Sequence, residues 1–308
     1  MSQSGFSMAM GVARDMILSR RRPVSVFRRD LAGKTVVFTG GTDGMGRVAA
    51  MRLVEMGASI RLAGRNPGKT AEAVAALNEI AGAERAFAVD CDLASLASVR
   101  ACAAGLLDSC PRIDLLVNCA GINTRRRVLS PDGNELNWAV NFLGAQVLTA
   151  LLLERIRASA PARVVNVSSA MVRAGRIDFD DLQMTRDWTS GKAYAQAKLA
   201  TNAATLALAR QLEGAGVTAH ALNPGFIRTA LLRDFRGPMR IWQWVMNWMA
   251  SPPEVGAERI VRVALSPEYE AVSGQFIDED TVCPPGSYVP DDESTARLWA
   301  LVEQTAAA

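Results

Sequence analysis

Short runs rich in β-branched residues alternate with alanine-rich stretches along most of this 308-residue chain. The alanine-rich stretches have the apolar spacing of helices, and the one at 201–216 ends on a glycine, a common helix stop. Strands separated by helices of this length form βαβ units, in which parallel strands are covered by helices on both faces. The pattern therefore predicts an α/β fold with a seven-stranded, mostly parallel sheet. The expected strands are KTVVFTG (34–40), SIRLAGR (59–65), RAFAVDCD (85–92), IDLLVNCAG (113–121), ARVVNVSSA (162–170), VTAHALNPG (217–225) and SGQFIDED (273–280).

The first predicted strand runs directly into the glycine-rich turn TGGTDGMG at 39–46, and a helix follows. Gly40, Gly44 and Gly46 allow a tight turn, a close approach of backbone to a pyrophosphate, and close packing of helix on strand. The free N–H groups of the helix N-terminus favour phosphate. The spacing is GxxxGxG rather than the commoner GxGxxG, and such a turn can also be a plain connector. Its place as the first βα turn predicts a single Rossmann-type doubly wound domain over 31–308, with a dinucleotide site.

The ends of the second and third strands carry the residues that would select the cofactor. Gly64 lies where sites for NAD commonly place an acid, and Arg65 follows it. A guanidinium there can pair with a 2′-phosphate, so the sequence favours NADP(H) over NAD(H). Asp92 ends the third strand, where its carboxylate either accepts from the adenine amine or caps the following helix.

Cysteine and histidine usage limits the chemistry. The five cysteines have no CxxC spacing, and His220 is the only histidine. This argues against a disulfide framework, a metal site and a Ser-His-Asp triad, and it suits a reducing, cytoplasmic compartment. His220 follows a strand-like run and is predicted to be a packed core residue.

The net charge of +3 is concentrated at the N-terminus. The basic extension 1–30 holds six arginines and two aspartates, which leaves −1 for the rest of the chain, so we expect no nucleic-acid partner. The extension lacks the run of about 18 apolar residues that a membrane span needs. Two interpretations stay open: a segment packed on the protein body or on a partner subunit, or an interfacial helix held to anionic lipid by its arginines.

Seven short motifs follow one another along the chain. They are TGGTDGMG (39–46), DCDL (90–93), NCAG (118–121), VNFLG (140–144), VNVSS (165–169), YAQAK (194–198) and NPGFIRT (223–229). In this order they resemble the short-chain dehydrogenase/reductase family from about Lys34 to Trp299. The segments 179–183 (FDDLQ) and 251–257 (SPPEVGA) make the chain similar to the branch that holds retinol dehydrogenases. Cys119 stands where the family usually has a second asparagine, and it is small enough for that place.

The resemblance implies a catalytic tetrad of Asn141, Ser169, Tyr194 and Lys198. Tyr194 would be the general acid and base, Ser169 would orient the substrate oxygen, and Asn141 would hold a proton-relay water. Ser168 and Ser169 cannot both face the site, because neighbouring strand residues point to opposite faces, and the family pattern favours Ser169.

The resemblance gives Lys198 two roles: it tunes Tyr194 and it contacts the nicotinamide ribose. The two residues are four apart, so their side chains leave the same face of a helix. A tyrosine titrates near pH 10, and lowering that value to 7 needs about 4 kcal/mol. An ammonium about 4–5 Å away supplies a similar amount, so Lys198 is predicted to lower the pKa of Tyr194.

The resemblance also implies the cofactor contacts. Pro224 and Gly225 would turn the chain so that the Ile227 N–H and Thr229 hold the nicotinamide carboxamide, which places hydride transfer in the pro-S class. The implied cofactor set is Gly40, Thr42, Asp43, Gly44, Met45, Gly46, Arg65, Asp92, Leu93, Asn118, Ala120, Gly121, Tyr194, Lys198, Pro224, Gly225, Ile227 and Thr229.

The segment after Thr229 is where the family has its variable substrate lid, here about 230–255. It contains Trp242, Trp244 and Trp248 together with several methionines, which suit a large apolar ligand, a membrane interface, or packing within the domain or a dimer. A loop at 283–290 precedes a C-terminal tail, 291–308, with a short helix expected near Leu298–Val302.

The sequence therefore predicts an NADP(H)-dependent oxidoreductase for a bulky lipophilic alcohol or carbonyl compound of retinoid, steroid or polyprenoid type. The alternative is a non-catalytic NADP(H)-binding scaffold or sensor at a membrane. A peripheral membrane contact through 1–30 or 239–250 and a homo-oligomer also remain open.

Overall fold

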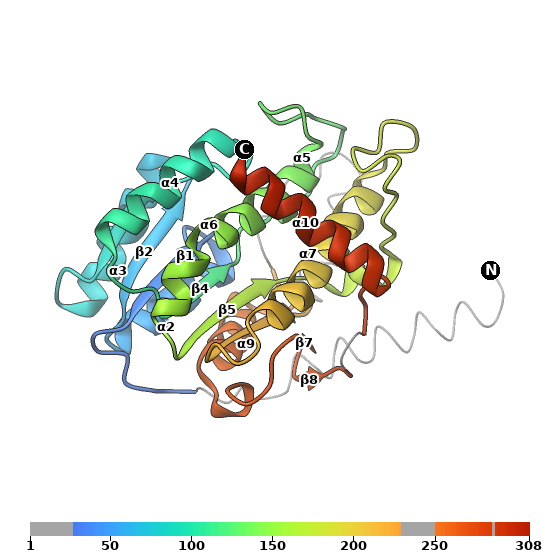
Figure 1. Cartoon of the computed structure of the whole chain (residues 1–308). Coiled ribbons are helices and arrows are strands. Elements are labelled where there is room, and N and C mark those ends of the chain that lie inside the picture. Colours follow the sequence, from blue (N-terminus) through green and yellow to red (C-terminus); the bar gives the residue numbers. More distant parts are fainter. Residues whose placement is uncertain (1–26, 229–249, 285–286) are drawn as a thin grey trace.

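An eight-stranded sheet runs through the middle of the protein in a computed structural model that describes residues 27–228, 250–284 and 287–308 (Figure 1). Its strands are β1 (Thr35–Thr39), β2 (Ser59–Gly64), β3 (Ala86–Asp90), β4 (Leu115–Asn118), β5 (Ala162–Val167), β6 (Val217–Asn223), β7 (Gln275–Asp278) and β8 (Thr281–Val282). They lie in the order β3-β2-β1-β4-β5-β6-β7-β8. The first seven are parallel, and β8 pairs antiparallel with β7 at the edge.

The α/β class, the parallel sheet and the seven predicted strands are confirmed. The sequence analysis misses β8, because a two-residue strand with both side chains exposed carries no hydrophobic pattern. Most of the predicted extension 1–30 and lid 230–255 lies outside the described residues.

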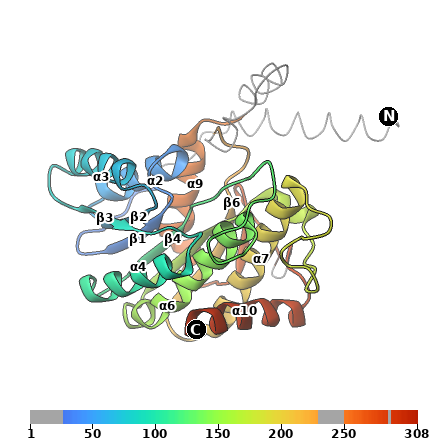
Figure 2. The same cartoon turned by 90° about the horizontal axis from the view of Figure 1, so that it is seen from above.

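Helices cover both faces of the sheet, as Figure 2 shows from above. One layer consists of α2 (Gly44–Glu55), α3 (Pro67–Ala81) and α9 (Pro253–Leu265). The other consists of α4 (Leu96–Ser109), α6 (Gly144–Ala158) and α7 (Ser190–Gln211), with α10 (Asp292–Ala307) packed on α6 and α7. Short helical segments are α5 (Leu136–Trp138), η1 (Ala139–Leu143), η2 (Ala170–Ala174) and η4 (Pro267–Tyr269).

Side-chain caps fix where the helices begin. Asn66 accepts from the N–H of Lys69 ahead of α3, and Thr189 accepts from the N–H of Lys192 ahead of α7. Asp291 caps α10 in the same way. Because of this cap, the C-terminal helix is much longer than the short segment predicted near Leu298–Val302.

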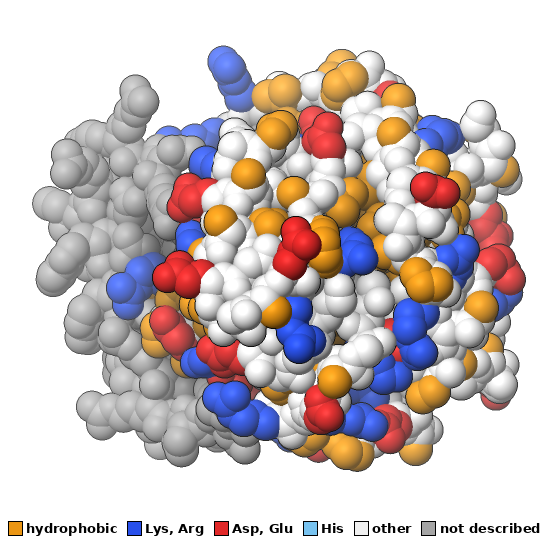
Figure 3. Space-filling model, turned by 90° about the vertical axis from the view of Figure 1, so that its left-hand side faces the viewer, with side chains coloured by type: hydrophobic (Ala, Val, Ile, Leu, Met, Phe, Trp, Pro, Cys, Tyr) orange, Lys and Arg blue, Asp and Glu red, His pale blue; other side chains and the backbone are white. Residues whose placement is uncertain are grey.

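Apolar side chains fill the space between the sheet and each helix layer. His220 is fully buried and its Nε2 lies 3.3 Å from the Tyr269 carbonyl oxygen, which confirms it as a core residue. Burial lowers the pKa of His220 to about 4. The face at the left of Figure 1, drawn in Figure 3, mixes acidic and basic side chains with scattered hydrophobic ones.

The continuous segment Leu136–Ala158 is long and apolar enough to cross a membrane, with a mean hydropathy of 1.5. However, 83% of its apolar window is buried inside the protein, where α6 packs against α4 and α10. We therefore interpret it as a core helix, since such helices in large α/β domains are apolar on nearly all sides.

The strand order places a crevice at the carboxyl ends of β1 and β4. The chain leaves β1 toward one face of the sheet, and it leaves β4 toward the other. The loops after these two neighbouring strands therefore diverge, and open α/β sheets bind ligands at such a switch point.

Candidate active site

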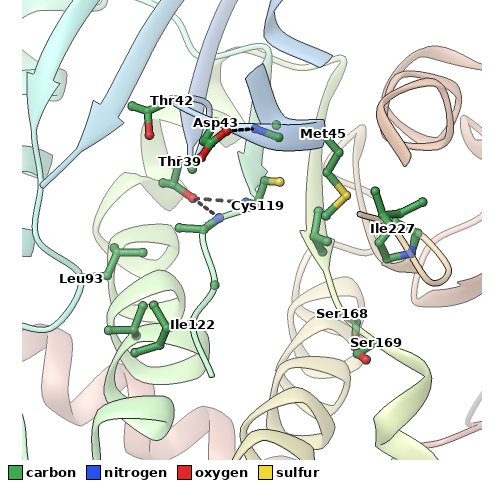
Figure 4. A pocket seen from close by; sticks show the side chains of 18 of the residues that line it. Thr39, Thr42, Asp43, Met45, Leu93, Cys119, Ile122, Ser168, Ser169 and Ile227 are labelled. Carbon is green, nitrogen blue, oxygen red and sulfur yellow. Dashed lines mark hydrogen bonds between the residues drawn. The ribbon is translucent and has the colours of Figure 1, made fainter. Parts of the chain in front are cut away.

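A cavity of about 470 Å³ opens at this switch point (Figure 4). Most of the predicted site residues line it, although they come from seven separate parts of the chain. They are Gly40, Thr42, Asp43, Gly44, Met45, Gly46, Arg65, Asp92, Leu93, Ala120, Gly121, Ser169, Tyr194, Lys198, Pro224, Gly225 and Ile227. Asn118 and Asn141 are not in its wall, and Thr229 lies outside the described residues.

The glycine turn after β1 is packed too tightly for side chains. Gly40 has φ +74°, and a Cβ on it would lie 2.5 Å from the Cα of Ala120. A Cβ on Gly46 would lie 2.2 Å from the Gly40 carbonyl oxygen. The Thr39 hydroxyl accepts from the N–H groups of Cys119 (3.2 Å) and Ala120 (3.3 Å), as the dashed lines of Figure 4 show. The turn is thereby held against the end of β4.

The N-terminus of α2 forms one end of the cavity. Asp43 caps it by accepting from the N–H of Gly44 at 2.7 Å, and the first turn carries no acidic residue. Backbone N–H groups at a helix N-terminus, beside a turn without side chains, form a cradle for phosphate groups. This end of the cavity fits the pyrophosphate of a dinucleotide.

The end of β2 excludes an acidic side chain. A Cβ on Gly64 would lie 2.4 Å from the Thr70 hydroxyl, so residue 64 has no room for one. The next residue, Arg65, lines the cavity, is exposed, and has neither an ion pair nor a hydrogen bond with any other described residue. The wall at this point is therefore cationic.

Asp92 lies at the end of β3, where one carboxylate oxygen accepts from the N–H of Ala94 at 3.0 Å. The cap of α4 is Ser95, which accepts from the N–H of Ser98. The alternative that Asp92 caps this helix is therefore wrong. Its carboxylate instead shapes the turn ahead of the helix and lines the cavity together with Cys91, which the sequence analysis did not select.

Asn118 lies behind the cavity wall and is buried. Its Nδ2 donates to the Thr149 hydroxyl at 2.9 Å and to Oδ1 of Asn166 at 2.8 Å. These bonds join β4, β5 and α6 below the site. The side chain supports the floor of the cavity rather than facing it.

The helix α7 brings Tyr194 and Lys198 to the cavity. The Lys198 Nζ lies 5.8 Å from the centroid of the Tyr194 ring and donates to the Val167 carbonyl oxygen at 2.7 Å. A Cβ on Gly121 would lie 3.2 Å from Asn141 Oδ1 and 3.8 Å from Lys198 Nζ, so these polar groups flank this glycine. Three of the four predicted catalytic residues thus line the cavity, and Asn141 lies directly behind Gly121.

Asn141 lies in η1, one turn of π-helix at the start of the long apolar segment. Its amide accepts from the N–H of Ile122 at 2.8 Å and donates to the Ile122 carbonyl at 2.9 Å. Its own carbonyl accepts from the Thr201 hydroxyl of α7 at 3.0 Å. Single π-turns inside helices are frequent at functional sites. This one links the loop after β4 to α7.

The two serines after β5, labelled in Figure 4, lie side by side but have different partners. The Ser168 hydroxyl is buried and donates to Oδ1 of Asn202 in α7 at 2.6 Å. The Ser169 hydroxyl accepts from the N–H of Met171 at 3.2 Å and lies close enough to Tyr194 to oppose the rise of its pKa. Both residues line the cavity, but only Ser169 influences the pKa of Tyr194.

Burial favours the neutral forms of both groups on α7. It raises the pKa of Tyr194 to about 12, against an opposing hydrogen bond from Ser169, and it lowers the pKa of Lys198 to about 8. The prediction of a lowered pKa for Tyr194 is therefore wrong. The Lys198 ammonium donates to the Val167 carbonyl, and the loss of solvent around the phenol is the largest influence on the pKa of Tyr194. At neutral pH Tyr194 therefore holds its proton.

Comparisons with known proteins match most of the chain. A family model described as short chain dehydrogenase matches residues 34–239. Retinol dehydrogenase 14 of Homo sapiens is 36% identical over 290 residues, covering 88% of this chain and 85% of that protein. Polyprenol dehydrogenase of Mus musculus is 35% identical over 303 residues, covering 95% and 90%. The solved Pseudomonas aeruginosa RhlG/NADP active-site complex has a TM-score of 0.65 at 25% identity, covering 84% of this chain and 97% of that one.

Proposed function

Because the chain belongs to the short-chain dehydrogenase family, in its retinol dehydrogenase-like branch, we propose that it is an NADP(H)-dependent oxidoreductase of bulky lipophilic alcohols and carbonyl compounds. The observation that carries this proposal is the joint presence of Ser169, Tyr194 and Lys198 in the cavity that begins at the glycine turn. A phosphate cradle at one end and a phenol with an ammonium at the other are what hydride transfer to a carbonyl requires.

Each residue of the site has one role. When bound, the cofactor supplies or accepts the hydride. Tyr194 gives its proton to the carbonyl oxygen during reduction and takes it back during alcohol oxidation. Ser169 hydrogen-bonds the same oxygen and fixes its direction. Lys198 stabilises the phenolate that remains. Asn141 lies next to the Lys198 ammonium, across Gly121, and holds a water that returns the proton from solvent.

The preference for NADP(H) follows from the end of β2. Gly64 cannot carry a side chain and Arg65 is exposed beside the cavity, so a 2′-phosphate gains a cation and meets no acid there. The RhlG complex, which contains NADP, has the same fold and supports this choice.

A lipophilic substrate agrees with the apolar part of the cavity wall. Ile122, Val140, Phe226 and Ile227 are among the residues that line it. The relatives named retinol dehydrogenase 14 and polyprenol dehydrogenase act on long apolar alcohols according to their names, and we propose the same substrate class here.

The substitution Tyr194→Phe tests the catalytic assignment. It removes one hydroxyl and keeps the ring, so NADPH-dependent turnover of retinal, a steroid ketone or a polyprenal should fall about 10²–10⁴-fold while NADPH binding persists. The control Tyr269→Phe removes a hydroxyl from a tyrosine that does not line the cavity and should leave turnover unchanged. If Tyr194→Phe matches the parent on every substrate consumed, the proposed acid is refuted. A parent that binds NADPH but turns over nothing favours the scaffold or sensor instead.

The substitution Arg65→Ala tests the cofactor assignment. Loss of a charge-assisted bond to the 2′-phosphate should weaken NADPH binding about tenfold and leave NADH binding unchanged. The control Arg85→Ala removes an arginine that donates to the Gly57 carbonyl, away from the cavity, and should change neither. Isothermal titration of both cofactors gives the comparison, and equal losses for NADPH and NADH would refute the assignment.

A further inference from the structure

The loop after β6 forms the cavity wall at the nicotinamide end and has an unusual support. Pro224, Gly225 and Ile227 line the cavity, and Gly225 has φ +88°. A Cβ on Gly225 would lie 2.6 Å from Nη1 of Arg259 and 3.0 Å from Cδ of Glu279. The loop therefore rests directly on two oppositely charged side chains from elsewhere in the chain.

Arg259 lies on α9, and its side chain is only 2% exposed. Its Nη1 donates to the Pro224 carbonyl at 2.7 Å, which is part of the loop itself. Its Nη2 lies 2.9 Å from a carboxylate oxygen of Glu279 and 2.8 Å from one of Asp280. Two carboxylates thus fix the guanidinium while it holds the loop backbone.

The two carboxylates belong to the segment 278–280, which comprises the last residue of β7 and the two-residue turn before β8 and which we call the turn Asp278–Asp280. Glu279 has φ +59°, a conformation that costs a residue other than glycine free energy and that persists where the surroundings enforce it. Its N–H donates to the Asn223 carbonyl at 2.8 Å. The turn is therefore attached to the loop through backbone as well as through Arg259.

The first residue of this turn connects the loop to the other side of the site. One carboxylate oxygen of Asp278 accepts from Asn223 Nδ2 at 2.6 Å, and the other pairs with Arg173. Arg173 lies in η2, whose first turn is capped by Ser169. The same three-residue turn thus holds both the nicotinamide loop and the segment that follows the proposed catalytic serine.

We infer that Arg259, held by the turn Asp278–Asp280, is a positioning residue that fixes the β6 loop where the nicotinamide ring binds. The inference rests on the proposed function. Hydride transfer needs the ring and the carbonyl carbon within a few tenths of an ångström of a productive position, and a glycine turn alone is too adaptable to ensure that. A buried ion pair beneath the loop gives it one conformation.

The test compares two ligands of the full-length protein: NADPH, and 2′-phospho-adenosine diphosphoribose, which lacks the nicotinamide. In Arg259→Met the affinity for NADPH should fall about tenfold and kcat should fall with it, while the affinity for the nicotinamide-free ligand stays unchanged. Asp280→Asn should give the same pattern with a smaller change. Asparagine is isosteric with aspartate, and the Asp280 side chain is 25% exposed, so this variant should fold. It therefore keeps the test valid if Arg259→Met does not fold.

A matched control lies on the same helix. Glu258 of α9 pairs with Arg52 of α2 at 3.0 Å, and neither side chain lines the cavity. Arg52→Met removes the ion pair with Glu258 and leaves the contacts of Arg259 with the β6 loop in place, so the binding of both ligands should match the parent.

Two outcomes overturn the inference. In the first, both variants bind NADPH and turn over as the parent does. In the second, they lose both ligands equally, which marks a merely structural role for the ion pair. A parent that binds neither ligand refutes the proposed function itself, and the inference with it, so the two failures are distinguishable.

Discussion

The burial of Lys198 and Tyr194 lowers the free energy of unfolding of the protein. Lys198 is 3% exposed, and the described chain gives its ammonium one hydrogen bond, to the Val167 carbonyl. Its pKa falls from 10.5 to about 8, and that of Tyr194 rises to about 12. A structural core would hold a methionine at 198, so the cost of this lysine is itself a sign of function.

This cost gives a prediction about stability. The lowered pKa of Lys198 corresponds to a destabilisation of the folded protein of about 3 kcal/mol. A methionine removes this cost, but it also removes the hydrogen bond to Val167, which stabilises the fold by about 1 kcal/mol. The variant Lys198→Met should therefore be inactive yet have a free energy of unfolding about 2 kcal/mol higher at pH 7. Urea unfolding at several pH values measures this.

The pH dependence has a fixed sign. Below pH 8 both the folded and the unfolded lysine are protonated, and the whole cost is present. Between pH 8 and 10.5 only the unfolded chain keeps the proton, so the cost shrinks, and the advantage of Lys198→Met should shrink with it. The control Lys192→Met, an exposed lysine on the same helix paired with Asp187, should change stability little. A variant Lys198→Met that is less stable than the parent at pH 7 contradicts the account.

The spacing of the motifs was enough to locate Tyr194 and Lys198 in the sequence. It did not predict whether the folded protein favours the charged or the neutral form of each side chain. The distance between Tyr194 and Lys198 along a helix is fixed by geometry, so their proximity could be predicted. The solvent that each loses depends on packing from β5 and the loop after β4, and no local pattern carries that information. For the same reason the sequence analysis placed Asn118 in the cofactor site, although its side chain bonds Thr149 and Asn166 below the site.

At the scale of elements, the loop after β4 is held by two asparagines. Asn141 makes two hydrogen bonds to the backbone of Ile122, and Asn137 accepts from the N–H of Thr124 at 3.1 Å and donates to its hydroxyl at 2.8 Å. All four bonds run from the segment 136–143 to the loop. Only the Asn141 amide also lies beside the Lys198 ammonium, across Gly121.

The two asparagines therefore form a matched pair of variants. Asn141→Ala should lower kcat about 10²-fold, because it frees the loop and removes the polar group next to Lys198. Asn137→Ala frees the loop at Thr124 and should lower kcat much less, even though both variants speed amide exchange in residues 121–124. Hydrogen exchange and steady-state kinetics provide the two readouts. Equal losses of kcat would show that Asn141 acts only by holding the loop.

Elements with a long periodic pattern were predictable, and short or charged ones were not. The strands of the parallel sheet and the glycine turn follow from hydrophobic runs and from Gly40, Gly44 and Gly46. The edge strand β8 and the turn Asp278–Asp280 have no such pattern. Arg259 was also missed, since a single arginine on an amphipathic helix normally faces solvent, and only the tertiary structure brings it beneath Gly225.

At the scale of the whole molecule, the topology brings the site together. The strand order places the ends of β1, β4, β5 and β6 side by side, so residues about 180 positions apart share one cavity. Seven ordered motifs were enough to predict this arrangement, because five of them lie at strand ends, one lies on α7, and VNFLG spans η1 and the start of α6. The substrate class could be proposed only from the apolar wall and the relatives, since the tryptophan-rich segment lies outside the described residues.

The central claim is that the protein transfers a hydride from NADPH to a lipophilic carbonyl, with Tyr194 as the acid. The most direct test uses NADPH carrying deuterium at both C4 positions, with retinal, a steroid ketone and a polyprenal as substrates, and mass spectrometry of the alcohol formed. We predict an alcohol with one deuterium on the carbinol carbon from the parent and from Tyr269→Phe, and almost none from Tyr194→Phe. Absence of the labelled alcohol from the parent with all three substrates, or an equal yield from Tyr194→Phe, would contradict the account.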